Sequence, residues 1–333
     1  MRLLNVTTRR LEEFFNDIPN YAILSHTWGK DEVTLQDLDR PEHASKRAYA
    51  KVDGVCSLAM RDGYNFVWVD TCCIDKTSSA ELSEAINSMF QWYADASVCY
   101  AYLEDVHKGN DPAISDSQFR RSRWFTRGWT LQELLAPRRV EFYNSAWLYV
   151  GDCSLLSAAI ESITGIPESY LQRGIDFRTA TIAVRMGWAA NRETTRKEDR
   201  SYSLLGIFGV NMTLLYGEGD RAFERLQLKI MERSTDNSIL AWGLPQTLVP
   251  SFMGWNYEGT PSDLVNSLPS RFDTKPHGVL ARRLEDFVAS LETSPVYEIK
   301  SVTEMTNRGL RITLPLLRME AQTYGILNFF YRR

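Results

Sequence analysis

One glutamate stands out chemically because the side chains around it are almost all apolar. Glu133 falls within a short predicted helix beside one tryptophan and three leucines: Trp129, Leu131, Leu134 and Leu135. The helix should end at Ala136, because Pro137 disfavours the helical conformation of the residue before it. A carboxylate among large apolar groups is partly desolvated, so its charge must be either paired or used in chemistry. The simpler interpretation is pairing with one of three nearby arginines, Arg127, Arg138 or Arg139.

Two other groups of reactive side chains each follow a short apolar run. The first is the turn His26–Gly29, and the second is Asp70–Asp75, which contains two adjacent cysteines. Cys72 or Cys73 could act as a nucleophile with His26 as base and Asp70 or Asp75 as the orienting carboxylate. A structural role is the competing interpretation for both turns, with Asp70 bonding only the backbone amides that follow it.

Alternating strands and helices should position these residues. Four buried strands are predicted, at Tyr21–Ser25, Phe66–Val69, Val98–Leu103 and Val140–Tyr143. A helix is predicted over Ala44–Arg61, with Lys46, Arg47 and Lys51 available for its solvent face. A second helix should follow Ser78, whose spacing to Glu81 is that of a capping box. This alternation indicates an α/β fold in which a parallel sheet has helices on both faces.

The predicted topology also locates a binding site. Open parallel sheets bind ligands in the crevice beyond the carboxyl ends of their strands. Both His26–Gly29 and Asp70–Asp75 follow such strand ends, so we expect them at the same edge of the sheet.

The remainder of the chain is organised differently, and we expect three parts in all. Residues 1–150 form the α/β core, and residues 151–243 form a helical extension because their apolar residues recur at helical spacing. Residues 244–333 form a small β-rich module that begins with a Pro- and Ser-rich stretch. Strands are predicted there at Tyr297–Ile299, Leu310–Leu314 and Gly325–Tyr331.

Composition excludes several classes of protein. The 333 residues carry 42 acidic and 38 basic side chains, for a net charge of −4, without a long basic run. We therefore expect no nucleic-acid partner. No stretch is apolar enough to span a membrane and the amino terminus does not resemble a signal peptide, so a cytoplasmic location is expected. The 5 cysteines lack a C-x-x-C pair, and we expect neither a disulfide framework nor a metal site.

Four blocks of sequence, in this order, resemble the fungal heterokaryon-incompatibility (HET) domain. They are Tyr21–Gly29, Trp68–Asp75, Arg127–Leu134 and Asp199–Phe208. The resemblance covers roughly residues 19–242. HET domains are linked in turn to the Toll/interleukin-1 receptor (TIR) fold, which implies a flavodoxin-like parallel sheet. On that pattern Ile23–His26 is similar to the first-strand box, Val69 and Asp70 to the second strand end, and Trp129 with Glu133 to a helix that carries a catalytic glutamate.

The resemblance implies a cell-death effector of fungal heterokaryon incompatibility that hydrolyses NAD at the nicotinamide–ribose bond. Glu133 would be the catalytic residue, and NAD would be a substrate, with no cofactor needed. The residues expected to bind the nucleotide are Ser25, His26, Thr27, Trp28, Gly29, Asp70, Cys73, Asp75 and Trp129. Trp28 or Trp129 could stack on a flat ring, and backbone amides near Gly29 could approach the phosphates. An activating protein partner or self-assembly is also implied.

The chemistry of this reaction fits a single carboxylate. Nicotinamide leaves as a neutral pyridine and needs no proton, while the ribose passes through an oxocarbenium-like state, as in glycoside hydrolysis. A glutamate held near the ribose in a low-dielectric setting would stabilise that positive charge.

Two alternatives remain. The chain could be a non-enzymatic, TIR-like assembly module, since many such domains act only as adaptors. It could also be a hydrolase that uses the cysteine and histidine named above.

Overall fold

The computed structural model describes most of the first 242 residues and short pieces of the rest. The described ranges are 1–38, 49–109, 111–240, 242, 280–287, 293–295, 304–306, 309–311, 316–319, 322–325 and 329–331. The predicted strand Tyr297–Ile299, the Pro- and Ser-rich stretch, and Lys46 and Arg47 lie outside these ranges.

Four parallel strands form the centre of a 7-stranded sheet. They are β3 (Ala22–His26), β4 (Phe66–Trp68), β5 (Val98–Leu103) and β6 (Val140–Asn144). Their order across the sheet is β4-β3-β5-β6, and each neighbouring pair is parallel. The strands are buried along almost their whole length, as expected for a parallel sheet covered on both faces. The predicted parallel α/β core is therefore confirmed for these four strands.

The edges of the sheet are antiparallel, so the prediction of a purely parallel sheet is wrong there. Strands β1 (Arg2–Asn5) and β2 (Leu11–Glu13) form a hairpin whose inner strand pairs with β4. At the opposite edge β7 (Tyr149–Asp152) runs antiparallel to β6. The connections within both pairs are too short for a crossover helix, and a short connection permits only antiparallel pairing.

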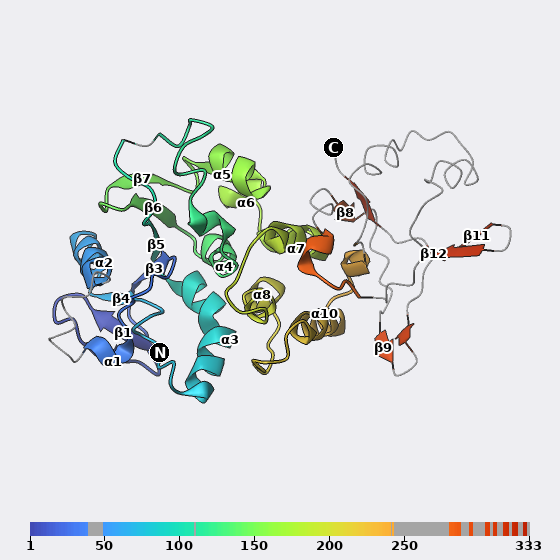
Figure 1. Ribbon diagram of the computed structural model, residues 1–333, viewed down its shortest axis with the longest axis horizontal. Helices are drawn as coiled ribbons and strands as arrows, with labels where there is room; N and C mark the ends of the chain where they lie inside the picture. The colour runs from blue at the N-terminus through green and yellow to red at the C-terminus, as the bar shows by residue number, and fades with distance from the viewer. Residues whose placement is uncertain are drawn as a thin grey trace. The chain divides into compact units, whose positions relative to one another are not determined.

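Helices α2 (Tyr49–Arg61) and α3 (Ser79–Asp95) connect the central strands. In Figure 1 they lie on either side of β3 and β4, as right-handed crossovers on the two faces of the sheet require. Ser78 is the N-cap of α3 and accepts a hydrogen bond from the Glu81 amide at 3.3 Å, which confirms the predicted start of this helix. The prediction that Lys51 faces solvent is wrong, because this side chain is buried beneath α2.

A short helix, α4 (Thr130–Leu135), precedes β6 and is buried at every residue. It follows a turn of 3-10 helix, η2 (Arg123–Thr126), that buries Trp124 and Phe125. Trp124 packs edge-on against Phe142 of β6, with ring centroids 5.4 Å apart. The predicted helix around Glu133 is thus confirmed, and aromatic packing fixes it against the sheet.

The rest of the described chain divides between two compact units. The first comprises residues 1–177, 192–195 and 203–214, and includes the sheet, α5 (Ser157–Thr164), α6 (Glu168–Leu171), η3 (Phe177–Thr179) in part and α9 (Leu205–Phe208). The second includes α7 (Ile182–Ala190), α8 (Asp199–Tyr202), α10 (Arg221–Arg233) and η4 (Asn237–Leu240). The predicted division at residues 150 and 243 stays a prediction.

Short antiparallel strand pairs occupy the described part of residues 293–331. They are β9 (Glu304–Thr306) with β10 (Gly309–Arg311), β11 (Leu316–Met319) with β12 (Gln322–Gly325), and β8 (Thr293–Pro295) with β13 (Phe329–Tyr331). The described helices include α1 (Leu35–Leu38) as well, and none of them is both long and apolar enough to cross a bilayer.

Candidate functional site

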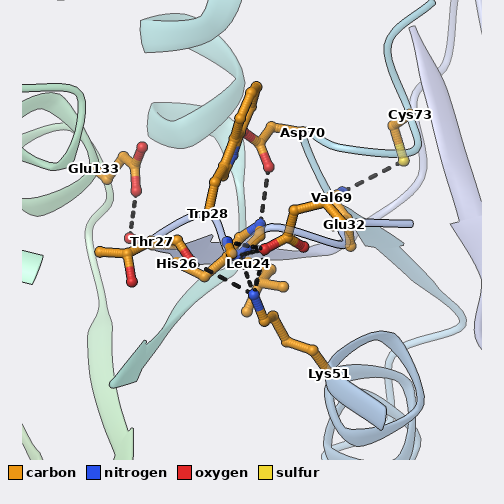
Figure 2. Close-up of polar contacts among 12 residues, drawn as sticks. Leu24, His26, Thr27, Trp28, Glu32, Lys51, Val69, Asp70, Cys73 and Glu133 are labelled. Atoms are coloured by element: carbon orange, nitrogen blue, oxygen red, sulfur yellow. Dashed lines mark hydrogen bonds and ion pairs between the residues drawn. The ribbon is translucent and has the colours of Figure 1, made fainter. Parts of the chain in front are cut away.

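The two predicted turns meet at the carboxyl ends of β3 and β4. His26, the last residue of β3, places Nε2 3.0 Å from Oδ1 of Asp70, which follows β4. The indole of Trp28 donates to Oδ2 of the same carboxylate at 2.7 Å, and Figure 2 shows Asp70 between these two residues. Burial acts to raise the pKa of Asp70, but the hydrogen bonds and charge of its partners outweigh it and hold the pKa below its ordinary value.

Lys51 completes this network from α2. Its Nζ lies 3.0 Å from Nδ1 of His26 and donates to Glu32 Oε1 at 2.7 Å and to the Thr27 carbonyl at 3.5 Å. Because the Asp70 carboxylate accepts from Nε2, that nitrogen carries the ring proton and Nδ1 accepts from the ammonium group. The residues His26, Asp70, Lys51 and Glu32 are called the histidine network below.

The amide of Gly29 belongs to the same network. It donates to Glu32 Oε1 at 2.6 Å, so this amide has an internal carboxylate partner in place of the phosphate expected from sequence. Burial acts to raise the pKa of Glu32, but His26, the Gly29 amide and Lys51 outweigh it and lower the pKa. A phosphate could reach the amide only after Glu32 moved away.

Trp28 retains substantial exposure, at 48%, although one face of its ring is covered. Lys76 Nζ lies 3.6 Å from the ring centroid, in a cation–π contact. Burial lowers the pKa of Lys76. A flat ligand ring could therefore stack only on the opposite face of Trp28.

Cys73 and Asp75 serve the turn that contains them. Cys73 is buried and its Sγ accepts from the Val69 amide at 3.3 Å, while Asp75 accepts from Thr77 and Gln36. Both ring nitrogens of His26 are engaged by other groups, so the cysteine–histidine arrangement is not assembled. The hydrogen bond with Cys73 and burial raise the pKa of Cys72 well above its ordinary value, which also disfavours a thiolate nucleophile.

Glu133 lies on the other side of β3 from His26. Neighbouring residues of a strand point to opposite faces of the sheet, and Ser25, beside His26, donates its hydroxyl to Glu133 Oε2. The indole of Trp124 donates to the same hydroxyl oxygen at 2.7 Å. Figure 2 shows Glu133 on the far side of the strand from Lys51.

The environment of Glu133 keeps its carboxyl group from ionising. The residue is 6% exposed, and burial raises its pKa to about 8. The charge of Asp70 also raises this pKa, whereas the Ser25 hydroxyl, Arg192 and Tyr93 act to lower it.

The predicted pairing with Arg127, Arg138 or Arg139 is wrong, because none of the three forms an ion pair with Glu133 in the part of the chain that the structure describes, and Arg138 is exposed. Arg127 donates to Thr195 at 3.4 Å, and Arg139 pairs with Glu141. Trp129, also predicted to line the site, is half-buried just before α4, and in the described chain no hydrogen bond or ring contact joins it to Glu133.

Sequence reasoning missed several members of the site, and only one of them carried a signal. Lys51 shares the apolar face of its helix with Val55 and Leu58, so a cation in that stripe could have marked a buried charge. No comparable sequence pattern marks Glu32, Trp124 or Arg192 as part of the candidate site.

The model of the heterokaryon incompatibility protein (HET) family matches residues 21–118, which include β3, β4 and β5 with the histidine network. Vegetative incompatibility protein HET-E-1 of Podospora anserina is 50% identical over 220 residues, which are 64% of this chain and 16% of that protein. This chain carries a HET domain.

The HET-domain match ends before α4, and a family described only as a domain of unknown function, DUF8212, matches residues 221–327. The matched part of the chain spans 16% of the length of this curated relative. No solved structure matches the chain. In the described ranges no group of three or more His, Cys, Asp or Glu side chains could hold a metal ion.

Proposed function

We propose that this HET domain acts in heterokaryon incompatibility by hydrolysing NAD at its nicotinamide–ribose bond, with Glu133 as the catalytic carboxylate. The observation that carries the proposal is the setting of Glu133. It is a buried carboxyl group that receives a hydroxyl hydrogen bond and no ion pair among the described residues. Such a group is costly to ionise in the free protein, which makes it suited to a ligand that brings positive charge.

The position of Glu133 in the fold supports the same proposal. The order β4-β3-β5-β6 is that of the first four strands of a flavodoxin-like sheet, and the TIR fold has this kind of sheet. Chain connections depart in opposite directions at β3 and β5, where such folds bind ligands. Ser25 and His26 pair with Ala101 and Tyr102 at this point.

The reaction needs only one carboxylate. As the bond between nicotinamide and C1′ breaks, its electron pair goes to the ring nitrogen, and nicotinamide leaves as a neutral molecule. Positive charge moves to the ribose, and ionised Glu133 would stabilise it across a medium of low dielectric constant. Water then adds to C1′ and releases one proton, which gives ADP-ribose.

Ligand charge would also prepare the catalyst. With a pKa of about 8, Glu133 is mostly protonated at neutral pH in the free protein. The positive pyridinium of NAD would favour the ionised carboxylate, because an opposite charge nearby lowers the pKa of an acid. The free protein would then hold its catalytic group uncharged until substrate arrives.

The histidine network has a supporting role in this proposal. It fixes Trp28 and the backbone of Thr27 beside the strand that carries Ser25. Its carboxylates each receive a charged or polar donor, so they remain ionised and rigid.

Glutamine at position 133 tests the proposal. Glu133→Gln keeps the size of the side chain but removes its charge, and loss of one such electrostatic group costs about 10²–10³ in rate. The assay is nicotinamide release from NAD by concentrated, purified protein at a series of protein concentrations, since activity is expected to rise on self-assembly. Glu141→Gln is the matched control, because Glu141 is also a buried glutamate but bonds Arg139 and Tyr143.

Two results would contradict this function. A folded Glu133→Gln protein that releases nicotinamide at the parent rate excludes Glu133 as the catalyst. Parent protein that leaves NAD intact at every concentration would instead indicate the non-enzymatic assembly module.

A further inference from the structure

Arg192 is the least satisfied charged group near Glu133, although it is distant in sequence. Residues 192–195 run beside the residues that lead into α4: the Glu193 amide donates to Thr126 at 2.7 Å, and the Gly128 amide donates to Glu193 at 2.8 Å. A Cβ atom at Gly128 would lie 2.4 Å from Cγ2 of Thr194, so this close approach requires glycine. Arg192 is thereby held firmly against the first turn of α4.

The guanidinium group of Arg192 has more donors than the protein supplies acceptors. Nη1 donates to the Arg127 carbonyl and to Oγ1 of Thr130, each at 2.9 Å. Nη2 is buried and has no hydrogen-bond partner within the described chain, and the residue is only 4% exposed. A buried charged donor without an acceptor is costly, because it has lost water and gained no replacement.

Geometry places this guanidinium on the same side of α4 as the catalytic carboxyl. Thr130, which anchors Nη1, and Glu133 are three residues apart and share one helix face. Glu133 and Arg192 affect each other electrostatically, but no ion pair between them occurs in the described ranges. While Glu133 is protonated, Arg192 is a buried cation with no anion beside it.

We propose that Nη2 of Arg192 binds the 5′-phosphate of the ribose whose developing positive charge Glu133 would stabilise. This inference rests on the proposed function and narrows its substrate class. The site would bind nicotinamide ribosides that carry a 5′-phosphate and would discriminate against nicotinamide riboside itself. The anomeric carbon C1′ and the carbon C4′, which carries the 5′-phosphate through C5′, flank the ring oxygen of a ribose. One ligand can therefore present positive charge to Glu133 and a phosphate to Arg192, one helical turn away along α4. Arginine suits this task because its planar donors match phosphate oxygens.

Arg173 offers a matched control at the other end of α4. Its Nη2 donates to the carbonyl groups of Leu134 and Pro137, both at 2.7 Å. Arg173 therefore stabilises the end of the helix and has no buried nitrogen left over among the described atoms. Loss of either arginine should weaken the packing of α4, but only loss of Arg192 should remove recognition of phosphate.

The experiment compares two substrates that differ only in phosphate. The ratio of kcat/KM for nicotinamide mononucleotide to that for nicotinamide riboside is measured for the parent, Arg192→Met and Arg173→Met. Since a hydrogen bond between charged partners is lost, the ratio should fall about 10- to 100-fold in Arg192→Met and stay at the parent value in Arg173→Met. Equal ratios in all three proteins would overturn the inference, because a purely structural arginine affects both substrates alike.

A binding measurement separates this inference from the proposed function. In the Glu133→Gln background, calorimetry should show nicotinamide mononucleotide binding more tightly than the riboside, with the preference lost when Arg192→Met is added. If this preference exists but Glu133 proves dispensable for cleavage, only the catalytic proposal fails. If no preference exists, or neither compound binds, the phosphate site is excluded. If Arg192→Met does not fold, Arg192→Lys takes its place, because lysine keeps the charge but lacks the planar pair of donors. An unchanged preference for the mononucleotide over the riboside in Arg192→Lys would also contradict the inference.

Discussion

Ser25 and His26 are neighbours on β3, yet they serve two opposite electrostatic environments. On the His26 side, the carboxylates Asp70 and Glu32 receive hydrogen bonds from an imidazole, an indole, an ammonium and an amide, and their pKa values are lowered. On the Ser25 side, Glu133 is more deeply buried and has hydroxyl partners but no ion pair among the described residues, and burial raises its pKa to about 8. One strand therefore separates carboxylates that are compensated from one that is not.

The two sides of the strand differ in what they contribute to stability. A compensated network tolerates burial and rigidifies the turn that follows the strand. An uncompensated carboxyl contributes nothing comparable to stability when ionised, which is why the proposed catalytic role is assigned to Glu133 rather than to Asp70 or Glu32. The same reasoning applies to Arg192, whose pKa burial lowers to about 9.

The largest effect should come from removing the cation of the histidine network. Lys51→Met leaves Glu32 without its ammonium partner and His26 without a donor to Nδ1. Breaking a buried pair in this way typically costs about 3–5 kcal/mol of unfolding free energy, measured by urea denaturation. Arg61→Met is the control on the same helix, because its exposed ion pair with Asp62 should contribute less than about 1 kcal/mol. Equal losses in the two variants would show that the network is not compensated as described.

On the Ser25 side we expect a smaller change in unfolding free energy, and here the substitution should stabilise the protein relative to the parent as the pH rises. The pKa of Glu133 is raised from 4.5 to about 8, so between these values the unfolded chain has released its proton while the folded chain retains it. The unfolding free energy of the parent should therefore fall with pH across this range, by about 1.4 kcal/mol per unit and roughly 3 kcal/mol from pH 5 to pH 7. Glu133→Gln should lack this fall.

The groups that face Glu133 must remain in both proteins for that comparison, namely Ser25, Tyr93, Asp70, Arg192 and Cys99. Urea titrations of parent and variant at pH 5, 6 and 7 give the difference directly. Parallel pH dependences would mean that Glu133 ionises normally and that the contrast between the two sides is wrong.

The smallest loss of unfolding free energy is expected on substitution of Asp70. This residue bonds His26 and Trp28, and its charge also acts on Glu133. Asp70→Asn can still accept from His26, but its amide group would then face the indole N–H of Trp28 as a second donor. The cost should be about 1–3 kcal/mol, with a shift of tryptophan emission as Trp28 becomes freer. Asp75→Asn is the control, since Asp75 bonds Thr77 and Gln36 on the surface. A matching emission change in the control would remove Asp70 from the site.

The central strands were predictable because continuous apolar runs identify buried parallel strands directly. Val98–Leu103 was predicted with the bounds that the structure has, and Ser78 identified the start of α3. The edge strands were not, because β2 and β7 are short, partly exposed and lack a continuous apolar run.

Contacts among the candidate site residues could be predicted where chain order implies proximity, but not elsewhere. His26 ends β3 and Asp70 follows the neighbouring parallel strand β4, so their contact could be expected from topology. Arg192 lies in a densely charged segment that indicates a solvated surface, and only tertiary contacts bury it. The partner of Glu133 was sought among local arginines, but Ser25 is 108 residues away in sequence.

The pairing of residues 192–195 with the start of α4 also bears on how the molecule folds. The hydrogen bond from Arg192 to Arg127 closes a loop of 65 residues, and Gly128 leaves space for that contact by having no side chain. Closing such a loop costs conformational entropy, which the contacts at its base must offset. Weakening those contacts would release the segment that holds the guanidinium near Glu133. The electrostatic environment of Glu133 therefore depends on a contact between two segments that are 65 residues apart in sequence.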